Sequence, residues 1–287
     1  MTDRTLITPR AHDLGGGFTV RRALPAAAQR SVGPFVFFDH FGPVLAGPES
    51  QHDVRPHPHI GLATVTYLYD GAMMHRDSTG AVQRIEPGAI NWMTAGRGIV
   101  HSERTPDELR AKTRRSHGLQ LWVALPADLE ETEPTFAHTP AAAIPALEVG
   151  GARLRVLVGE AFGAASPVVA ASPTLFIDAQ LSAGDAFPAP LATERALYGV
   201  DGPFQLDGQT IPAQTLVVLA AGEEPLVSAE AEVRIALVGG EPLGPRFIWW
   251  NFVSSRKERI EQAGDDWAAG RFATVPGETE FIPLPAR

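Results

Sequence analysis

Short apolar runs separated by glycine and proline constrain the fold of this chain more than any other feature. The 287 residues include 28 glycines and 25 prolines, spread along the whole sequence. Between them lie runs of about five to eight residues, the length of an ordinary strand. The clearest runs are Phe35–Phe38, Ala63–Tyr69, Ala89–Met93, Leu119–Leu125, Leu154–Val158, Thr174–Ile177, Arg195–Val200, Thr215–Leu219 and Val233–Val238. This pattern predicts an all-β protein built from sandwiches or barrels.

Helix signals are scarce. Thr105–Glu108 has the form of a capping box with proline at the first helical position, so a short helix is expected there. Ser255–Glu258 is a second capping box, followed by apolar residues at helical spacing and by Gly270, which can end a helix. We predict one longer helix over Arg256–Ala269, packed on the outside of a barrel.

The two halves of the chain look like distant copies of one barrel. Thr66–Gly71 and Leu197–Gly202 each read as a strand that ends at glycine, and a turn and the next strand follow each of them. We therefore predict two domains at residues 1–130 and 151–287, joined by a linker at 131–150, with the terminal helix in the second domain. All nine histidines lie between His12 and His138, so only the first domain can hold a histidine-ligated metal.

Composition excludes several classes of protein. There is no cysteine, so any metal must be bound by nitrogen and oxygen ligands. The net charge of −9 and the lack of a long basic run argue against direct contact with nucleic acid. No run approaches the roughly 18 apolar residues of a membrane span, and Met1–Arg10 contains no apolar signal segment. A cytoplasmic location without membrane contact is expected.

Two short motifs carry potential metal chemistry, namely His57-Pro58-His59 and His101-Ser102-Glu103. Side chains two apart in a strand point to the same face, so each motif would present a pair of ligands to one side of a sheet. Three imidazoles and one carboxylate suit Fe(II), Mn(II), Ni(II), Co(II) or Cu(II). Pro58 is acceptable in such a strand only at an edge or at its start.

Rival interpretations remain for the other histidines. His75 and Asp77 are also two apart, but the Asp77–Gly80 segment has aspartate first and glycine last and is more typical of a β-turn. Asp39-His40 reads as a local pair rather than as a ligand pair. We assign no role to the remaining histidines, which are His12, His52, His117 and His138.

An ordered series of motifs over roughly residues 30–126 resembles the pirin family. It comprises Gly33-Pro34-Phe35, Asp39–Pro43, His57-Pro58-His59, Thr64–Tyr67, His75–Ser78, Trp92–Glu103 and Gly118–Trp122. Trp250–Val253 and the helix after it are similar to the family's C-terminal domain. The resemblance implies two cupin-type jelly-roll barrels in tandem, with a metal in the N-terminal barrel only.

The resemblance also implies site residues and a function. It assigns the metal to His57, His59, His101 and Glu103, most simply as Fe(II), with Mn, Ni, Co, Cu or Zn as alternatives. It implies a quercetin 2,3-dioxygenase-type cleavage of a flavonol or similar polyphenol by O2, with Glu103 as ligand and general base. Ile60 and Ala63 depart from the arginine and glutamate of many pirins, which predicts a more apolar pocket mouth.

The alternative function is regulatory. Some members of the family act as metal- or redox-sensing proteins that bind partner proteins, as transcriptional co-regulators do. A change in the charge of the metal could then bias nearby loops. The acidic balance of the chain suits contact with proteins better than contact with DNA.

Overall fold

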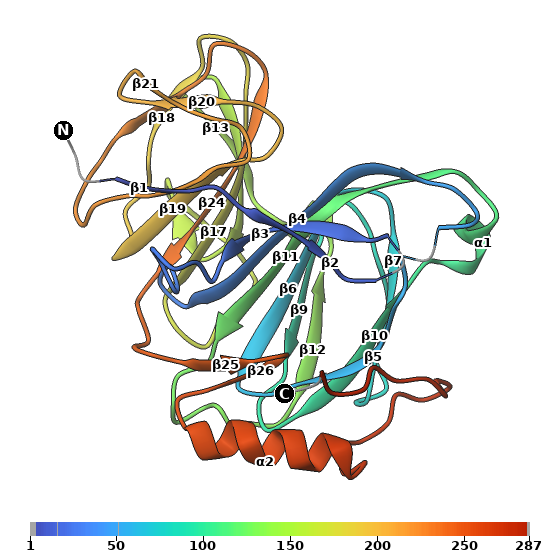
Figure 1. Cartoon of the computed structure of the whole chain (residues 1–287). Coiled ribbons are helices and arrows are strands. Elements are labelled where there is room, and N and C mark those ends of the chain that lie inside the picture. The colour runs from blue at the N-terminus through green and yellow to red at the C-terminus, as the bar shows by residue number, and fades with distance from the viewer. Residues whose placement is uncertain (1–3, 16, 51, 286–287) are drawn as a thin grey trace. The chain divides into compact units, whose positions relative to one another are not determined.

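The computed structural model describes residues 4–15, 17–50 and 52–285, and most of its regular structure is strand (Figure 1). The chain divides into two compact units that interleave along the sequence. We call them the histidine unit (residues 12–20, 40–138 and 243–287) and the apolar unit (residues 1–11, 21–39 and 139–242). Among the described residues, each contains one seven-stranded and one four-stranded sheet, and the prediction of an all-β protein with two cupin-type barrels is confirmed.

In the histidine unit the large sheet has the order β12-β9-β6-β11-β4-β3-β2, and the small sheet has the order β5-β10-β7-β8. The bounds are β2 Arg10–Asp13, β3 Thr19–Leu24, β4 Phe35–Ala46, β5 Val54–His59, β6 Leu62–Asp70, β7 Met73–Asp77, β8 Val82–Ile85, β9 Ile90–Thr94, β10 Ile99–Arg104, β11 Arg114–Ala124 and β12 Thr135–Thr139. A hairpin of β25 (Phe247–Trp249) and β26 (Phe252–Ser254) completes the unit. Strands β2, β3 and β4 each begin in one unit and end in the other.

The apolar unit repeats the pairing of a large and a small sheet. Its sheets have the orders β1-β22-β19-β24-β17-β14-β13 and β18-β23-β20-β21, with a hairpin of β15 and β16. The bounds are β1 Thr5–Ile7, β13 Ala146–Val149, β14 Ala152–Val158, β15 Glu160–Ala161, β16 Ala164–Ala165, β17 Thr174–Leu181, β18 Ala186–Pro188, β19 Glu194–Gly199, β20 Phe204–Leu206, β21 Gln209–Ile211, β22 Leu216–Val218, β23 Leu226–Ser228 and β24 Val233–Gly240.

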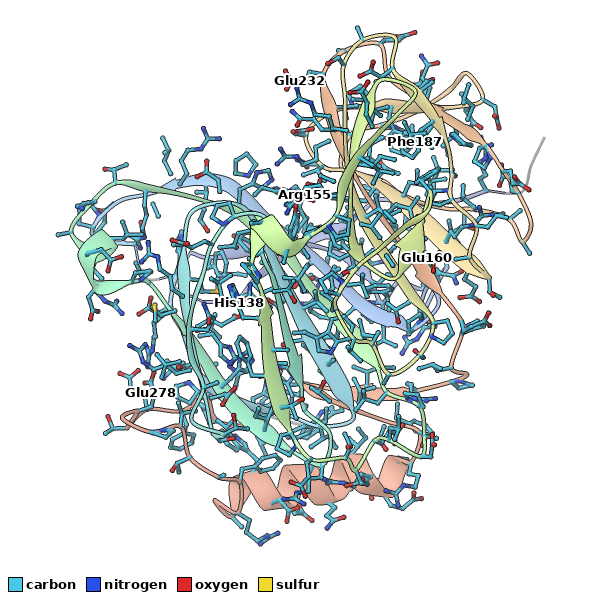
Figure 2. All side chains as sticks on the ribbon, turned by 180° about the vertical axis from the view of Figure 1, so that it is seen from behind. His138, Arg155, Glu160, Phe187, Glu232 and Glu278 are labelled. Carbon is cyan, nitrogen blue, oxygen red and sulfur yellow. The ribbon has the colours of Figure 1, made fainter. Side chains whose placement is uncertain are left out.

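The interior of the apolar unit is packed with aliphatic and aromatic side chains. Phe187, which Figure 2 labels, is 1% exposed and belongs to one cluster with Ile177, Leu237 and other buried residues from both sheets. Burial of this kind contributes roughly 1.5–3 kcal/mol for each large apolar side chain, which stabilises the unit. The prediction that the histidines belong to one barrel alone agrees with this packing.

In the part of the chain that the structure describes, three helical segments accompany the strands: α1 (Asp107–Arg110), the 3-10 turn η1 (Ala141–Ala143) and α2 (Lys257–Ala268). The predicted longer helix is confirmed as α2, and Gly270 ends it at φ +67°. Neither predicted capping box forms, because α1 and α2 start without a side-chain cap. Among the described residues, no helix has the length and apolarity needed to cross a membrane.

Helix α2 packs within the histidine unit. Ile260 and Ala263 of the helix are buried in one cluster with Ile60 and Phe252, and Figure 1 shows the helix beside β25 and β26. Each predicted strand run overlaps an observed strand and extends at most one residue beyond either end of it, but the predicted linker at 131–150 contains β12, η1 and β13. The contiguous bounds 1–130, 131–150 and 151–287 stay a prediction about sequence segments, since the spatial units interleave.

Candidate metal centre

The order β5-β10-β7 of the small sheet places the two predicted ligand motifs on neighbouring strands. His57 lies directly opposite His101, and His59 lies opposite Ile99. Residues that face each other across an antiparallel pair point to the same side of the sheet. The period of two along each strand then brings His59 to that side as well. Strand β5 is an edge strand, which explains how Pro58 is tolerated within it.

The three imidazoles converge. One ring nitrogen from each of His57, His59 and His101 can be chosen so that all three lie within 4.8 Å of one another. The ring centroids are 4.3 Å apart for His57 and His101, 5.0 Å for His57 and His59, and 5.1 Å for His59 and His101. All three side chains are buried, and Trp122 packs edge-on against His59.

Backbone carbonyls orient two of these rings. Nδ1 of His57 donates a hydrogen bond to the carbonyl oxygen of Arg55 at 2.9 Å. Nδ1 of His59 donates to the carbonyl oxygen of Asn251, at the β25–β26 turn, at 3.1 Å. A carbonyl can only accept, so Nδ1 carries the proton in both rings and Nε2 keeps its lone pair. This arrangement is the one that metal-binding histidines use.

Burial keeps the three rings neutral at neutral pH. It lowers the pKa of His57 to about 4. Burial, followed by the neighbouring histidines, also holds the pKa values of His59 and His101 well below the ordinary value for histidine. Neutral imidazole is the form that binds a metal, so the protein holds its ligand atoms ready without removing protons.

His101 supplies the test of whether a metal fits. Its Nε2 is buried and has no hydrogen-bond partner among the described residues. Its Nδ1 lies 3.4 Å from Nδ1 of His75 on the adjacent strand β7. A buried polar atom without a partner is costly, and coordination of a cation would satisfy it. Three neutral imidazoles suit a divalent transition metal, and the residues present therefore fit one.

Glu103 lies on the same strand and the same side of the sheet but outside the three-histidine group. It is 8% exposed, and burial raises the pKa of its carboxyl to about 7. Its Oε1 lies 3.4 Å from the hydroxyl of Thr66, whose one proton is donated to Gln120 Oε1 at 2.9 Å. A ligand role for Glu103, and the ligand set as a whole, stay predictions.

The rival histidines have other partners. The predicted turn at Asp77–Gly80 is confirmed, because the amide of Gly80 donates to the carbonyl of Asp77 at 3.0 Å. Nε2 of His40 lies 2.9 Å from Nε2 of His117, and the expected local pair of His40 with Asp39 stays a prediction. Asp39 accepts two hydrogen bonds from Arg22. Spacing in the sequence could not reveal either pair.

The two departures from the family pattern, Ile60 and Ala63, are both buried. Ile60 is 1% exposed and packs against Phe252 and Ile260 beneath α2, and Ala63 is fully buried on β6. The predicted apolar mouth stays a prediction. The carbonyl of Ile60 accepts a hydrogen bond from the amide of Val253, which joins the end of β5 to the β25–β26 hairpin.

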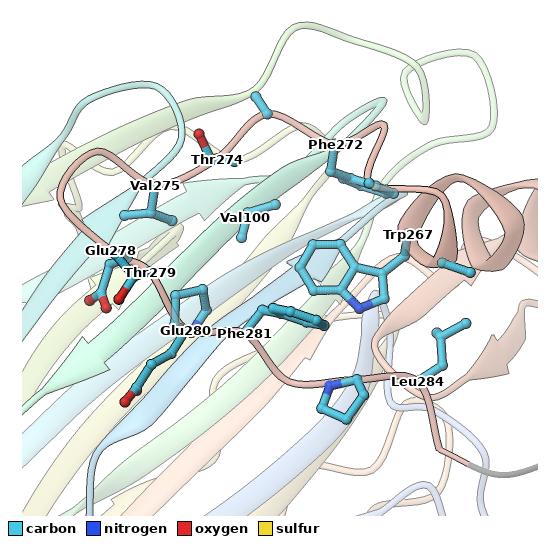
Figure 3. A pocket seen from close by; sticks show the side chains of 15 residues that line it. Val100, Trp267, Phe272, Thr274, Val275, Glu278, Thr279, Glu280, Phe281 and Leu284 are labelled. Carbon is cyan, nitrogen blue, oxygen red and sulfur yellow. The ribbon is translucent and has the colours of Figure 1, made fainter.

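A pocket of about 540 Å³ lies on the outer side of the ligand strands (Figure 3). Pro56 and Val100 line it, as do Trp267, Phe272 and Phe281 from α2 and the segment after it. Pro56 and Val100 directly precede His57 and His101, so their side chains leave the sheet on the opposite face. The pocket and the histidine site are therefore on opposite sides of β5 and β10.

Comparisons with known proteins agree with this fold. Residues 17–123 match the Pirin family, and residues 176–273 match the Pirin C-terminal cupin domain. A pirin-like protein of Caulobacter vibrioides is 48% identical over 282 residues, which is 96% of this chain and 97% of that protein.

Two crystal structures described as quercetin 2,3-dioxygenase from Acinetobacter baumannii are similar to this chain. One is 35% identical with a TM-score of 0.92, covering 99% of this chain and 95% of the other. The second is 28% identical with a TM-score of 0.87, covering 94% of this chain and 97% of the other. With both domain matches and the 48% identical relative, these likenesses establish that the chain is a member of the pirin family.

Proposed function

We propose that this chain is a metal-dependent dioxygenase that cleaves a flavonol or a similar polyphenol with O2. The observation that carries the proposal is the set of three neutral, inward-facing imidazoles of His57, His59 and His101. Structures described as quercetin 2,3-dioxygenase share the fold at up to 35% identity, which supports the same reaction class.

The chain's own residues would perform three tasks. His57, His59 and His101 would hold one divalent metal, most simply Fe(II), with Mn, Ni, Co, Cu or Zn as alternatives, and Glu103 would be a fourth ligand. The metal would supply Lewis-acid activation and a route for dioxygen chemistry that side chains lack. The surrounding burial excludes bulk water and strengthens every electrostatic interaction at the site.

Glu103 is suited to act as the general base. Burial raises the pKa of its carboxyl to about 7, so it can take a proton and give it back near neutral pH. In the proposed reaction it accepts the proton of the flavonol hydroxyl, and the Thr66 hydroxyl beside Oε1 can steady either protonation state. The ring then opens with O2 and loses carbon monoxide.

The test combines metal content with substrate chemistry. Elemental analysis, anaerobic quercetin binding and aerobic turnover would be measured for the wild type, His57→Ala and Glu103→Ala. His138→Ala is the matched control, because His138 is partly buried and bonds to Asn91 away from the three-histidine group. We expect His57→Ala to lose metal and turnover, Glu103→Ala to lose turnover, and His138→Ala to keep both.

A regulatory role is the second candidate, and one observation favours it. The outer pocket exposes Phe281, which is 59% exposed, on the reverse face of the strands that carry the histidines. A partner protein seated there would contact the segments that a change of metal charge reaches first. Bound metal without turnover, even after iron reconstitution, would reject the dioxygenase and favour this role.

A further inference from the structure

The three site histidines differ in what fixes their proton. His57 and His59 each donate from Nδ1 to a backbone carbonyl, which can only accept. Nδ1 of His101 instead faces another imidazole nitrogen, Nδ1 of His75, at 3.4 Å. An imidazole nitrogen can donate or accept, so this contact alone does not decide which nitrogen of His101 carries its proton.

Asp77 decides the state of His75. Oδ2 of Asp77 lies 2.9 Å from Nε2 of His75, and the carboxylate is completely buried. Oδ1 of the same carboxylate is occupied by the amides of Thr79 and Ala81 and by the hydroxyl of Thr79. An ionised carboxylate can only accept, so Nε2 of His75 must carry a proton.

The proton position on His75 determines the proton position on His101. A neutral imidazole has one N–H, so a proton on Nε2 of His75 leaves Nδ1 as an acceptor. Nδ1 of His101 must then donate to it, which leaves the lone pair of His101 on Nε2. That is the buried atom with no hydrogen-bond partner among the described residues.

The pairing of β10 with β7 and a stacked phenylalanine hold Asp77, His75 and His101 in place. His101 lies opposite Asp77 in the β10–β7 register, which puts both side chains on one face. The ring of His75 stacks on Phe136 of β12 with centroids 4.2 Å apart and planes 16° from parallel. The stack fixes the plane of His75, so that one nitrogen meets Asp77 and the other meets His101.

We infer that Asp77 and His75 are positioning residues that set the tautomer of His101 and thereby complete three inward-facing lone pairs for a divalent metal. The inference depends on the metal site proposed above. Outer partners of this kind typically change metal affinity 10- to 100-fold when they are altered.

Asp77→Asn is the decisive variant because the turn dictates how the amide must sit. The three donors at Oδ1 require the amide oxygen there, so the NH2 group faces His75. His75 Nε2 then becomes an acceptor, its Nδ1 donates to His101, and the proton of His101 moves to Nε2. Asp77→Asn should therefore reverse both tautomers and block the inward lone pair of His101.

The experiment has two readouts. In metal-free protein labelled with 15N-histidine, long-range NMR correlations report which nitrogen of each ring is protonated. We expect His75 protonated at Nε2 and His101 at Nδ1 in the wild type, and the reverse in Asp77→Asn. Competition with a chelator then gives the dissociation constant for Co(II), which should rise about 10- to 100-fold in Asp77→Asn.

Two further variants complete the test, Thr79→Ala as a control and His75→Phe as a fallback. Thr79→Ala removes one bond to Oδ1 but keeps the carboxylate at His75, so it should match the wild type in tautomers and affinity. His75→Phe keeps a ring on Phe136 without nitrogens. If Asp77→Asn does not fold, this variant carries the test, with both His101 tautomers populated and weaker Co(II) binding.

Several results would overturn the inference. They are a wild-type His101 protonated at Nε2, a His75 protonated at both nitrogens, or a folded Asp77→Asn with unchanged tautomers or unchanged affinity. A wild type that shows the expected tautomers but does not bind Co(II) would reject the proposed metal site while leaving the tautomer assignment intact.

Discussion

His57 and His101 face each other across neighbouring antiparallel strands, with ring centroids 4.3 Å apart. The pairing register of β5 and β10 therefore determines that the two rings meet at the candidate metal site. Any change that shifts these strands by one residue would turn one of the two rings to the outer face of the sheet.

A divalent metal should stabilise the folded protein. A ligand that binds only the folded state at 100 times its dissociation constant adds about 2.7 kcal/mol to the free energy of unfolding. We expect the melting temperature of wild type to rise with Co(II) and to fall back on adding EDTA. His59→Ala should lose this response, and His138→Ala should keep it. A response in His59→Ala equal to that of wild type would contradict the assignment.

Glu103 should make the metal-free protein sensitive to pH. The unfolded chain releases this proton near the ordinary pKa of 4.5, whereas the folded protein keeps it until about pH 7. Folding therefore becomes less favourable as pH rises between these values, by roughly 3 kcal/mol. Glu103→Gln should match wild type near pH 4 and exceed it in stability at pH 8.

Chemical denaturation of the metal-free proteins from pH 4 to pH 8 would measure this difference. Glu258→Gln, at an exposed glutamate on α2, is the matched control and should follow wild type at each pH. A constant difference between Glu103→Gln and wild type over this range would show that the carboxyl is not perturbed in the folded protein.

Gly61→Ala should be strongly destabilising. Gly61 has φ +67°, and a Cβ there would overlap the carbonyl oxygen of Val253. Gly80→Ala is the matched control, since Gly80 has φ +93° but no atom within 4 Å of its Cβ position. We expect Gly61→Ala to cost about 1–3 kcal/mol more than Gly80→Ala in urea denaturation. Equal costs would mean that the β25–β26 hairpin can move away from the added methyl group without a cost in free energy.

Glu278→Gln should loosen the segment after α2. Glu278 accepts hydrogen bonds from the hydroxyl of Ser102 and from Nε and Nη2 of Arg104, and the Arg104 bonds are the main reason that its pKa is lowered. A lowered carboxyl pKa means that the folded protein favours the ionised form of Glu278. The stabilisation from its bonds to Arg104 is therefore present at neutral pH and is lost as pH falls through the pKa of Glu278 in the folded protein.

Hydrogen exchange of the amide of Glu278, which donates to the carbonyl of Val275, would report this loosening. Faster exchange in Glu278→Gln at pH 7 is expected, with a difference of about 1 kcal/mol or less because the pair is partly solvated. Glu280→Gln is the control, since Glu280 is 57% exposed in its pair with Arg104. Equal exchange in both variants at pH 7 would contradict the prediction.

Much of the candidate site could be predicted from local spacing. His57 and His59, and likewise His101 and Glu103, are two apart, and strand periodicity alone puts each pair on one face. The same rule applies to His75 and Asp77, but the turn that begins at Asp77 masked it. Asp77 has two roles, because its Oδ1 accepts a hydrogen bond within the turn and its Oδ2 faces His75.

Contacts between distant residues could not be predicted in this way. Ser255 reads as a helix cap, yet its amide donates to the buried carboxylate of Glu130, 125 residues away. His59 depends on the carbonyl of Asn251, and His40 meets His117. None of these partners lies at a spacing that periodicity could single out, because each is set by which strands and loops become neighbours.

The sequence by itself determined the positions of nine strands, the longer helix and the faces on which the candidate ligand pairs lie, since these follow from turn residues and from the periods of strands and helices. Only the tertiary structure decided that β10 lies between β5 and β7. That order gives His101 two histidine neighbours across the site and His75 behind it. Strand order and register are set by the packing of whole sheets, which no local spacing encodes.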